Sequence, residues 1–200
     1  MGLKRNQSPM IYDQLGNRKY LTAEERRAFM KAAQRVEPEV ETFCLTLAYT
    51  GARISEVLAL IPRRIDFSVR GITIESLKKR KHGIFRTVPV PEILLERLDT
   101  VHGIKIAQAD IAFQDKRIWN FCRTTAWQRV KEVMSEAQVS GVWAVPKGLR
   151  HGLGVEGTAE ANIPLNVIQR WLGHSRIETT AIYANAVGRE ERALATRTWH

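Results

Sequence analysis

Basic and nucleophilic side chains recur along the chain in an order that suits chemistry on a phosphodiester. Arg53 follows a glycine that breaks an apolar stretch, and Arg150 and His151 stand side by side in a glycine-rich segment. His174 follows another glycine, and Tyr183 comes 9 residues later. A phosphodiester can be cleaved without a metal if two guanidinium groups neutralise its non-bridging oxygens, an acid protonates the leaving oxygen and a hydroxyl attacks in line. The set predicts this phosphoryl-transfer chemistry.

Each of these residues, taken alone, also has an ordinary structural explanation. Arg53 would pair with Glu56, three residues on, as neighbours on a helix surface do. Arg150 would belong to a solvated basic helix start, and His174 would cap a helix. Tyr183 would pack without a chemical role. No single residue decides between the two interpretations, whereas the order and spacing of the whole set favour the chemistry.

The composition favours a nucleic-acid partner. The chain has 31 Lys and Arg against 21 Asp and Glu, a formal net charge of +10. So basic a chain favours polyanions, which bind with release of counterions. Hydrophobic residues make up 44% of the chain, enough for a real core. Cys44 and Cys122 stand far apart, which favours isolated thiols in a reducing cytoplasm over a disulfide framework or a zinc site. We expect no membrane span and no metal.

The elements that must position the candidate residues are mainly helical. Thr22 and Glu25 have the spacing of a capping box, in which the hydroxyl caps the first turn and the carboxylate reaches back. Pro38 opens the next helical pattern, and Gly51 interrupts it. Helical patterns cover residues 23–35, 38–50, 54–60, 91–101, 124–139, 148–160, 164–172 and 177–187.

Short β-branched segments interrupt this helical pattern. Residues 65–67 and 72–74 are of this kind, and residues 85–90 alternate between polar and apolar side chains. We expect a small antiparallel sheet in which residues 78–83 form a basic turn between the last two strands. The predicted fold class is therefore mainly α with a small antiparallel β-sheet, an α+β arrangement.

Two long motifs make the chain resemble the tyrosine recombinases, the phage-integrase family. Residues 50–60 (Thr-Gly-Ala-Arg-Ile-Ser-Glu-Val-Leu-Ala-Leu) look like the first-arginine box of that family. Residues 148–151 (Gly-Leu-Arg-His), 163–174 and 179–183 (Thr-Thr-Ala-Ile-Tyr) look like its second box, which is long and specific. The resemblance covers about residues 21–187 and implies the integrase catalytic-domain fold, which breaks and rejoins DNA.

The resemblance implies a role for each matched residue. Arg53 and Arg150 would clamp the scissile phosphate, and Tyr183 would attack it to give a 3′-phosphotyrosine and a free 5′-hydroxyl. His174 would hydrogen-bond the phosphate and stabilise the transition state. The resemblance implies no metal, nucleotide or other cofactor, because the phosphotyrosine bond retains the energy for rejoining.

In the family the general acid is a lysine in the turn between the second and third strands. We assign Lys78 to this role because it comes directly after the strand, with Lys79 and Lys81 as alternatives. The remaining side chains of this turn, among Lys79, Arg80 and Lys81, are expected to contact DNA.

One position departs from the family pattern. Three residues before the second arginine the family usually has His, and this chain has Lys147. A lysine can donate to the phosphate or share the acid's work. However, it stays protonated at neutral pH, because its ordinary pKa is about 10.4 against about 6.5 for His. The proton acceptor for Tyr183 is therefore open. His151 is a candidate, although in the family this neighbour of the arginine is mostly supportive.

The expected organisation is a flexible basic arm over residues 1–20, the catalytic domain over 21–187 and a tail over 188–200. Most family members carry an N-terminal helical domain that grips the other face of the DNA, and here about 20 residues precede the catalytic domain. We expect a short stand-alone member, similar to the fimbrial-switch enzymes, with a fragment as the alternative. The resemblance implies four protomers on two double-stranded DNA sites, exchanging residues 189–200, with accessory DNA-bending proteins on nucleoid, plasmid or phage DNA.

Two alternatives of other classes remain open. The first is an accessory or regulatory DNA-binding protein that kept the fold and lost the chemistry, which Lys147 and the missing N-terminal domain would favour. The second is a helix-turn-helix transcription factor, reading residues 164–183 as two helices around a glycine turn. This second alternative leaves Arg53 and the basic turn at residues 78–83 unexplained.

Overall fold

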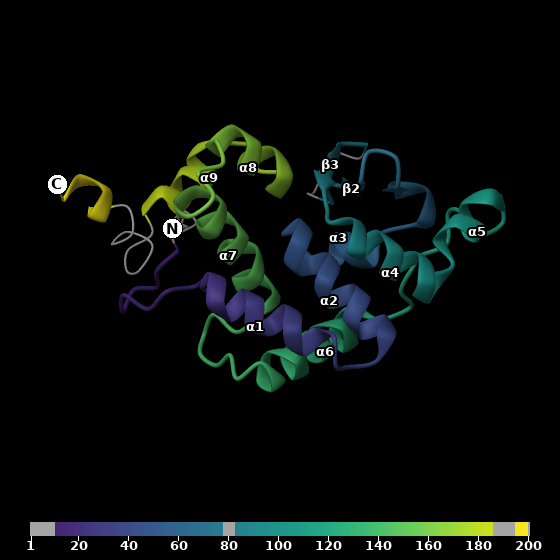
Figure 1. Ribbon diagram of the computed structural model, residues 1–200, viewed down its shortest axis with the longest axis horizontal. Coiled ribbons are helices and arrows are strands. Elements are labelled where there is room, and N and C mark those ends of the chain that lie inside the picture. Colours follow the sequence, from purple (N-terminus) through teal and green to yellow (C-terminus); the bar gives the residue numbers. More distant parts are fainter. Residues whose placement is uncertain (1–10, 78–82, 186–194, 200) are drawn as a thin grey trace, which may run out of the picture.

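Helices form most of the structure, and a small sheet lies between the third and fourth of them in the chain (Figure 1). The computed structural model describes residues 11–77, 83–185 and 195–199. Its helices are α1 (Ala23–Ala33), α2 (Pro38–Thr50), α3 (Ile54–Leu58), α4 (Glu92–His102), α5 (Ile104–Ala109), α6 (Arg123–Glu136), α7 (Pro146–Ala159), α8 (Leu165–Leu172) and α9 (Glu178–Ala181). Its strands are β1 (Ile65–Asp66), β2 (Gly71–Glu75) and β3 (Phe85–Pro89), with 3-10 turns at Pro62–Arg64, Ile182–Asn185 and Thr196–Thr198. The expected α+β fold class is confirmed.

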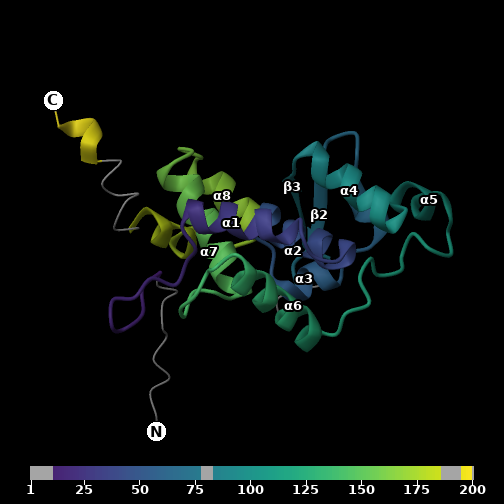
Figure 2. The same cartoon turned by 60° about the horizontal axis from the view of Figure 1, so that its bottom comes forward.

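Helix α2 lies in the middle of the molecule, with one group of elements on each side of it. Figures 1 and 2 both show α7, α8 and α9 on one side of α2, and the sheet with α4 and α5 on the other. Helix α2 begins at Pro38, whose fixed backbone suits a first helical position, and ends at Gly51 in the left-handed conformation (φ 59°). The sequence predicted both of these boundaries.

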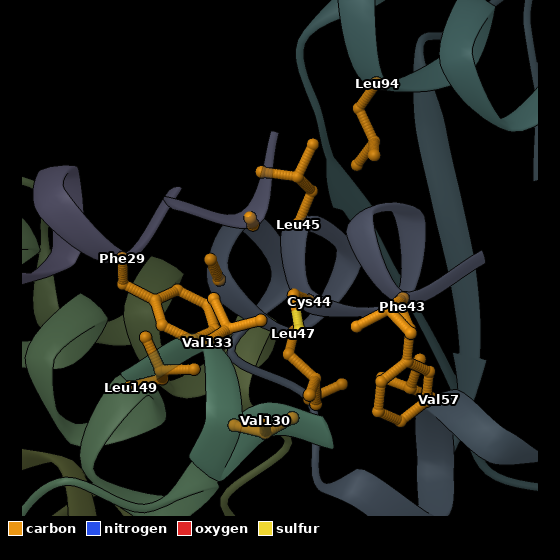
Figure 3. Close-up of a cluster of buried hydrophobic side chains, with 14 of the residues drawn as sticks. Phe29, Phe43, Cys44, Leu45, Leu47, Val57, Leu94, Val130, Val133 and Leu149 are labelled. Carbon is orange, nitrogen blue, oxygen red and sulfur yellow. The ribbon is translucent and has the colours of Figure 1, made fainter. Parts of the chain in front are cut away.

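The main core is built around α2. Phe43, Cys44 and Leu47 of this helix are almost completely buried. Figure 3 shows Cys44 and Leu47 on the side of Phe29 of α1, Val130 of α6 and Leu149 of α7, and the Phe43 ring next to Val57 of α3. Because α2 contacts apolar faces of three other helices, its position fixes Gly51 and the loop that follows it.

The three strands form an antiparallel sheet in the order β1-β2-β3. Ile72 pairs with Val88, and Ile74 pairs with Arg86. Along β3 the side chains of Arg86 and Val88 are buried while their neighbours are exposed. An arginine therefore occupies a core-facing position of this strand, and its partners must come from other elements.

Residues 11–20 belong to the arm expected over residues 1–20; both ends of this segment are packed, and residues 14–17 between them are exposed. Ile11 and Tyr20 are buried in a second apolar cluster. Arg18 pairs with the Glu25 carboxylate at 2.5 Å, and its guanidinium lies 4.2 Å from the ring centre of Trp143. Ile11, Tyr20 and the Arg18–Glu25 ion pair thus hold a segment whose polar composition had predicted a flexible arm. The rest of the expected arm lies outside the described residues.

Two further elements differ from the sequence prediction. Helix α5 was not predicted. Ile104 is its one buried residue, so its sequence carries no apolar repeat at helical spacing. The sequence predicted one helix over residues 177–187. In the structure the α-helix ends at Ala181, and the 3-10 turn Ile182–Asn185 follows it. In the described ranges, no helix combines the length and the apolar character that a membrane span requires.

The cap of α1 gives a direct test of the local structure. The Thr22 hydroxyl accepts a hydrogen bond from the Glu25 amide at 3.2 Å, and the Glu25 carboxylate accepts one from the Thr22 amide at 2.9 Å. Thr22→Ala removes the hydroxyl acceptor, so we expect the free energy of unfolding to fall by about 1 kcal/mol. Urea denaturation of the two proteins measures this difference. Thr22→Ser, which keeps the acceptor, should unfold close to wild type, and an equal loss in both variants would contradict the capping role.

Candidate active site

Six of the residues singled out in the sequence line one cavity of about 520 Å³. The cavity lies where the starts of α3 and α6, the first turns of α7 and the segment from His174 to Tyr183 meet. The predicted site residues that line it are Arg53, Lys147, Arg150, His151, His174 and Tyr183. Residues as far apart in the sequence as Arg53 and Tyr183 are thus brought to one place by the packing of α7 on α2 and of α8 on α7.

Helix α7 carries three of these side chains on one face. Lys147, Arg150 and His151 lie at relative positions i, i+3 and i+4, and Gly154 continues the same face at i+7. The absence of a side chain at Gly154 leaves room for the ring of Tyr183: an added Cβ would lie 2.4 Å from that ring. The glycine therefore allows the tyrosine to approach the helix that carries the basic groups.

Two backbone carbonyls fix the buried guanidinium of Arg150. Its Nη1 donates to the carbonyl of Gly51 at 2.7 Å, and its Nη2 donates to the carbonyl of Leu172 at 2.6 Å. These carbonyls belong to the ends of α2 and α8, where helix carbonyls need external donors. Burial and the neighbouring charge of Arg53 lower the pKa of Arg150 to about 10, so it is still a cation at neutral pH.

Arg53 is held by a carboxylate that lies out of contact with solvent. Its Nη1 donates to Oε1 of Glu56 at 2.6 Å, and its backbone amide donates to Oε2 at 3.0 Å. The Arg53 side chain is 33% exposed, whereas that of Glu56 is 0% exposed. Burial by itself raises the pKa of Glu56, but the charge and hydrogen bond of Arg86 and those of Arg53 outweigh it, so the net pKa is lowered. The helix-surface pair weighed in the sequence analysis is thus a buried contact within the site.

The hydroxyl of Tyr183 contacts a second member of the α7 face. Its oxygen lies 3.0 Å from Nδ1 of His151, and its ring is stacked on the imidazole of His174 with 6.1 Å between centroids. Tyr183 is buried, and this burial raises its pKa to about 12, partly offset by the positive charges of Arg150 and Arg53. The structure therefore holds the phenol neutral, next to a nitrogen that can accept its proton.

His151 is held in its neutral form. Burial, followed by the positive charges of Lys147 and Arg150, lowers its pKa to about 3. Its second ring nitrogen, Nε2, is buried and has no hydrogen-bond partner within the part of the chain that the structure describes. An anion in the cavity would reverse part of this effect, because a nearby negative charge favours the protonated imidazole.

His174 is positioned by the turn that follows α8. Gly173 ends that helix in the left-handed conformation (φ 66°), as its place in the sequence predicted. Nδ1 of His174 lies 2.9 Å from the buried hydroxyl of Thr180, so the ring is fixed from the α9 side. This contact joins the end of α8 to α9 and keeps the His174 imidazole in the cavity lining.

The predicted basic turn cannot be compared with the structure. Lys78, Lys79, Arg80 and Lys81 lie outside the described residues. Lys147 is described: it is exposed at the start of α7 and lines the cavity. Across the described residues, no group of three or more His, Cys, Asp or Glu side chains could hold a metal ion.

Sequence reasoning missed three contributors to the site. Arg86 donates to Glu56 from β3, and Arg123 and Trp127 of α6 line the cavity with exposed side chains. Arg123 and Trp127 are four residues apart, so they share one helix face. The signal for Arg86 was its place at a core-facing position in the alternation of residues 85–90.

Comparison with known proteins agrees with the resemblance drawn from the motifs. Residues 19–189 match the family described as "Phage integrase family". This chain belongs to the phage integrase family. Its family segment contains all six cavity residues named above, from Arg53 to Tyr183.

Relatives of this phage integrase family member include recombinases of archaea and bacteria. It is 27% identical over 182 residues to tyrosine recombinase XerA of Pyrococcus furiosus, covering 90% of this chain and 61% of that protein. It is 30% identical over 150 residues to tyrosine recombinase XerD of Shewanella oneidensis, covering 70% of this chain and 47% of the relative. The chain spans about half to three fifths of the length of these relatives.

Solved structures share the fold. The crystal structure of XerA recombinase superposes with a TM-score of 0.73 at 22% identity, over 90% of this chain and 62% of the other. The catalytic domain of bacteriophage HP1 integrase gives a TM-score of 0.61 at 22% identity, over 88% of this chain and 93% of that domain. The fold of this family member is therefore that of integrase catalytic domains.

The helix-turn-helix alternative does not fit the structure. It requires a second helix long enough to lie in the major groove. Helix α9 is 4 residues long, and Tyr183 and Thr180 after the turn are buried. The segment over residues 164–183 is therefore part of the site and presents no recognition helix.

The neutral state of His151 predicts a pH-dependent stability. Unfolded, the imidazole takes up a proton below its ordinary pKa of 6.5, whereas folded it does so near pH 3. Its contribution is therefore full above pH 6.5 and is lost as the pH falls from 6.5 toward 3. Between pH 7 and pH 5 this amounts to about 2 kcal/mol of unfolding free energy. Urea denaturation at the two pH values measures it.

His151→Asn keeps a polar group at the Nδ1 position and removes the titration, so we expect a smaller loss of stability between pH 7 and pH 5. His102, whose pKa burial lowers to about 4, makes a separate contribution of the same sign. His102→Asn is the matched control, and the two reductions should add because His102 and His151 do not share contacts. An unchanged pH dependence in His151→Asn would show that His151 is not held neutral.

Proposed function

We propose that this protein is a site-specific recombinase that cleaves and rejoins DNA strands through a phosphotyrosine formed on Tyr183. The observation that carries the proposal is the placement of the Tyr183 hydroxyl beside a cavity lined by Arg53, Arg150 and His174. Guanidinium groups are suited to the non-bridging oxygens of a phosphate. The membership of the phage integrase family supports the same reaction class.

In the proposed cleavage step the Tyr183 oxygen attacks phosphorus and the bond from phosphorus to the 5′-oxygen breaks. The products are a 3′-phosphotyrosine and a free 5′-hydroxyl. Arg53 and Arg150 neutralise the two non-bridging oxygens, and His174 donates a hydrogen bond to the phosphate as negative charge develops. Rejoining is the reverse reaction with the 5′-hydroxyl of another strand, so the number of phosphodiester bonds is conserved.

Two protons must move in this step. The proton of Tyr183 passes to Nδ1 of His151, the basic atom 3.0 Å from its oxygen. This transfer is unfavourable in the resting protein, because the pKa of Tyr183 is about 12 and that of His151 about 3. A bound phosphate favours the imidazolium but disfavours the phenolate. We therefore propose that the proton leaves Tyr183 as its oxygen bonds to phosphorus. The leaving 5′-oxygen receives its proton from a lysine, for which we propose Lys78, with Lys147 of the cavity as a second donor.

We further propose that double-stranded DNA approaches the side of the molecule on which the cavity opens. Lys147 and Arg123 are exposed there and supply phosphate contacts, together with Lys79, Arg80 and Lys81 of the basic turn. The catalytic domain comprises residues 21–187, four protomers assemble on two sites, and residues 189–200 pass between them. Accessory DNA-bending proteins would assist this assembly on nucleoid, plasmid or phage DNA.

A second candidate function is DNA binding without cleavage, in an accessory or regulatory protein. One observation favours it: Tyr183 is 0% exposed, and its ring lies in the apolar cluster formed with Ile11 and Tyr20. A tyrosine stored in this way must move or be uncovered before it can attack. The two functions therefore differ in whether DNA brings Tyr183 onto the phosphate.

A nicked suicide substrate distinguishes them. DNA from the region around the encoding locus is incubated with wild type and with Tyr183→Phe, and the mixtures are run under denaturing conditions. We expect a covalent protein–DNA band for wild type and none for Tyr183→Phe, because phenylalanine lacks the attacking oxygen. Tyr49→Phe, which alters a half-buried tyrosine outside both the cavity lining and the cluster around Tyr183, is the matched control and should give the band. DNA binding without any covalent band would favour the accessory function.

A further inference from the structure

Arg86 is a charged residue whose side chain points from β3 into the protein core, and the proposed chemistry assigns it no role. It lies on β3 between the exposed residues Phe85 and Thr87, and its own side chain is 5% exposed. A guanidinium so placed must be compensated, because an unpaired buried charge is strongly destabilising. The partners of Arg86 identify what it does.

The first partner is the carboxylate that holds Arg53. Nη2 of Arg86 donates to Oε2 of Glu56 at 2.6 Å, while Oε1 accepts from Arg53. Glu56 thus divides its two oxygens between a buried guanidinium and one that lines the cavity. Without Arg86, the buried carboxylate would retain Arg53 as its charged partner and would draw that side chain away from the cavity.

The second partner is the end of α8. Nε of Arg86 donates to the carbonyl of Trp171 at 2.7 Å, next to the carbonyl of Leu172 that accepts from Arg150. The guanidinium also lies against Gly173, where an added Cβ would be 3.0 Å from Nη1. The helix end that carries His174 is therefore held between two arginines, Arg86 from the sheet and Arg150 from α7.

We propose that Arg86 is a positioning residue for strand cleavage, acting through Glu56 on Arg53 and through the end of α8 on His174. The inference rests on the proposed recombinase function. Arg86 does not line the cavity, so it acts on the transition state through groups that do. The same side chain ties β3, which follows the basic turn, to the loops that carry the phosphate clamp.

The test compares Arg86→Met with wild type on the nicked substrate under single-turnover conditions. Methionine retains apolar length and removes the donors. We expect the cleavage rate to fall on the order of 100-fold, as for other misplaced catalytic groups, while DNA affinity changes less than about threefold because Arg86 is buried away from the phosphate contacts. Arg86→Lys retains the charge with one donor group and should recover part of the rate.

A second substrate separates positioning from a loss of folded protein. In a methylphosphonate at the scissile position one non-bridging oxygen is replaced by methyl, so the transition state carries less negative charge and depends less on Arg53. We expect the ratio of the wild-type rate to the Arg86→Met rate to fall at least about tenfold on this substrate. A merely unfolded fraction would reduce both rates equally and leave the ratio unchanged.

The matched control is Arg97→Met, which breaks an arginine–glutamate pair with Glu41 outside the cavity. It should cleave both substrates at the wild-type rate. A folded Arg86→Met protein with the wild-type rate, or with the same defect on both substrates, would overturn the positioning role. If wild type itself forms no covalent complex, the proposed function fails, and that result is distinct from failure of this inference.

Discussion

The site depends on one buried carboxylate. Glu56 lies completely out of solvent and accepts from two guanidinium groups, Arg53 toward the cavity and Arg86 toward the sheet. Burial alone would favour its protonated form, and the two arginines keep it charged. Removing either arginine would leave an under-compensated charge in the core, which is among the most destabilising changes a protein can undergo. The charge of Glu56 therefore holds the guanidinium groups of Arg53 and Arg86 in place, and with them the position of Arg53 at the cavity.

The same logic extends to the carbonyl groups around Arg150. Its donors reach the ends of α2 and α8, while Arg86 reaches the neighbouring carbonyl of α8. Helix ends leave carbonyls without internal partners, and guanidinium groups satisfy them here in place of water. The positive charge concentrated in this way exceeds what Glu56 offsets. An anion bound in the cavity would therefore stabilise the arrangement, as the phosphate of the proposed reaction would.

Burial also sets the resting state of the nucleophile. Tyr183 packs against the α7 face through Gly154 and lies in an apolar cluster with Ile11 and Tyr20. Burial keeps both Tyr183 and His151 neutral, so the hydrogen bond between them joins two uncharged groups. In the proposed reaction, the phosphate and Tyr183 must therefore meet by a change in this environment, and the charge of bound DNA would supply one.

The sequence predicted the parts of the site that are encoded locally. Arg53, Arg150, His174 and Tyr183 each lie within a short motif segment, and helix stops such as Gly173 can be recognised from a single residue and its neighbours. The Thr22 capping box is local in the same sense.

The features that sequence reasoning missed depend on contacts between distant segments. Arg86 stands 30 positions from Glu56, and nothing near β3 in the sequence names its partner. The packing of residues 11–20 was missed because their polar composition hides two apolar anchors, Ile11 and Tyr20, whose pocket is formed by α7 and α8. Helix α5 has too few buried residues to produce a periodic signal.

We expect Arg53, Arg150, His174 and Tyr183 to converge on one phosphate. A crystal structure of the protein with orthovanadate and a DNA duplex interrupted at the cleavage position tests it most directly, because vanadate adopts the five-coordinate geometry of phosphoryl transfer. We expect the Tyr183 oxygen in one apical position and the DNA 5′-oxygen in the other, with both guanidinium groups and His174 on the equatorial oxygens. Vanadate bound without these side chains, or a Tyr183 still buried against His151 while DNA occupies the cavity, would contradict the claim.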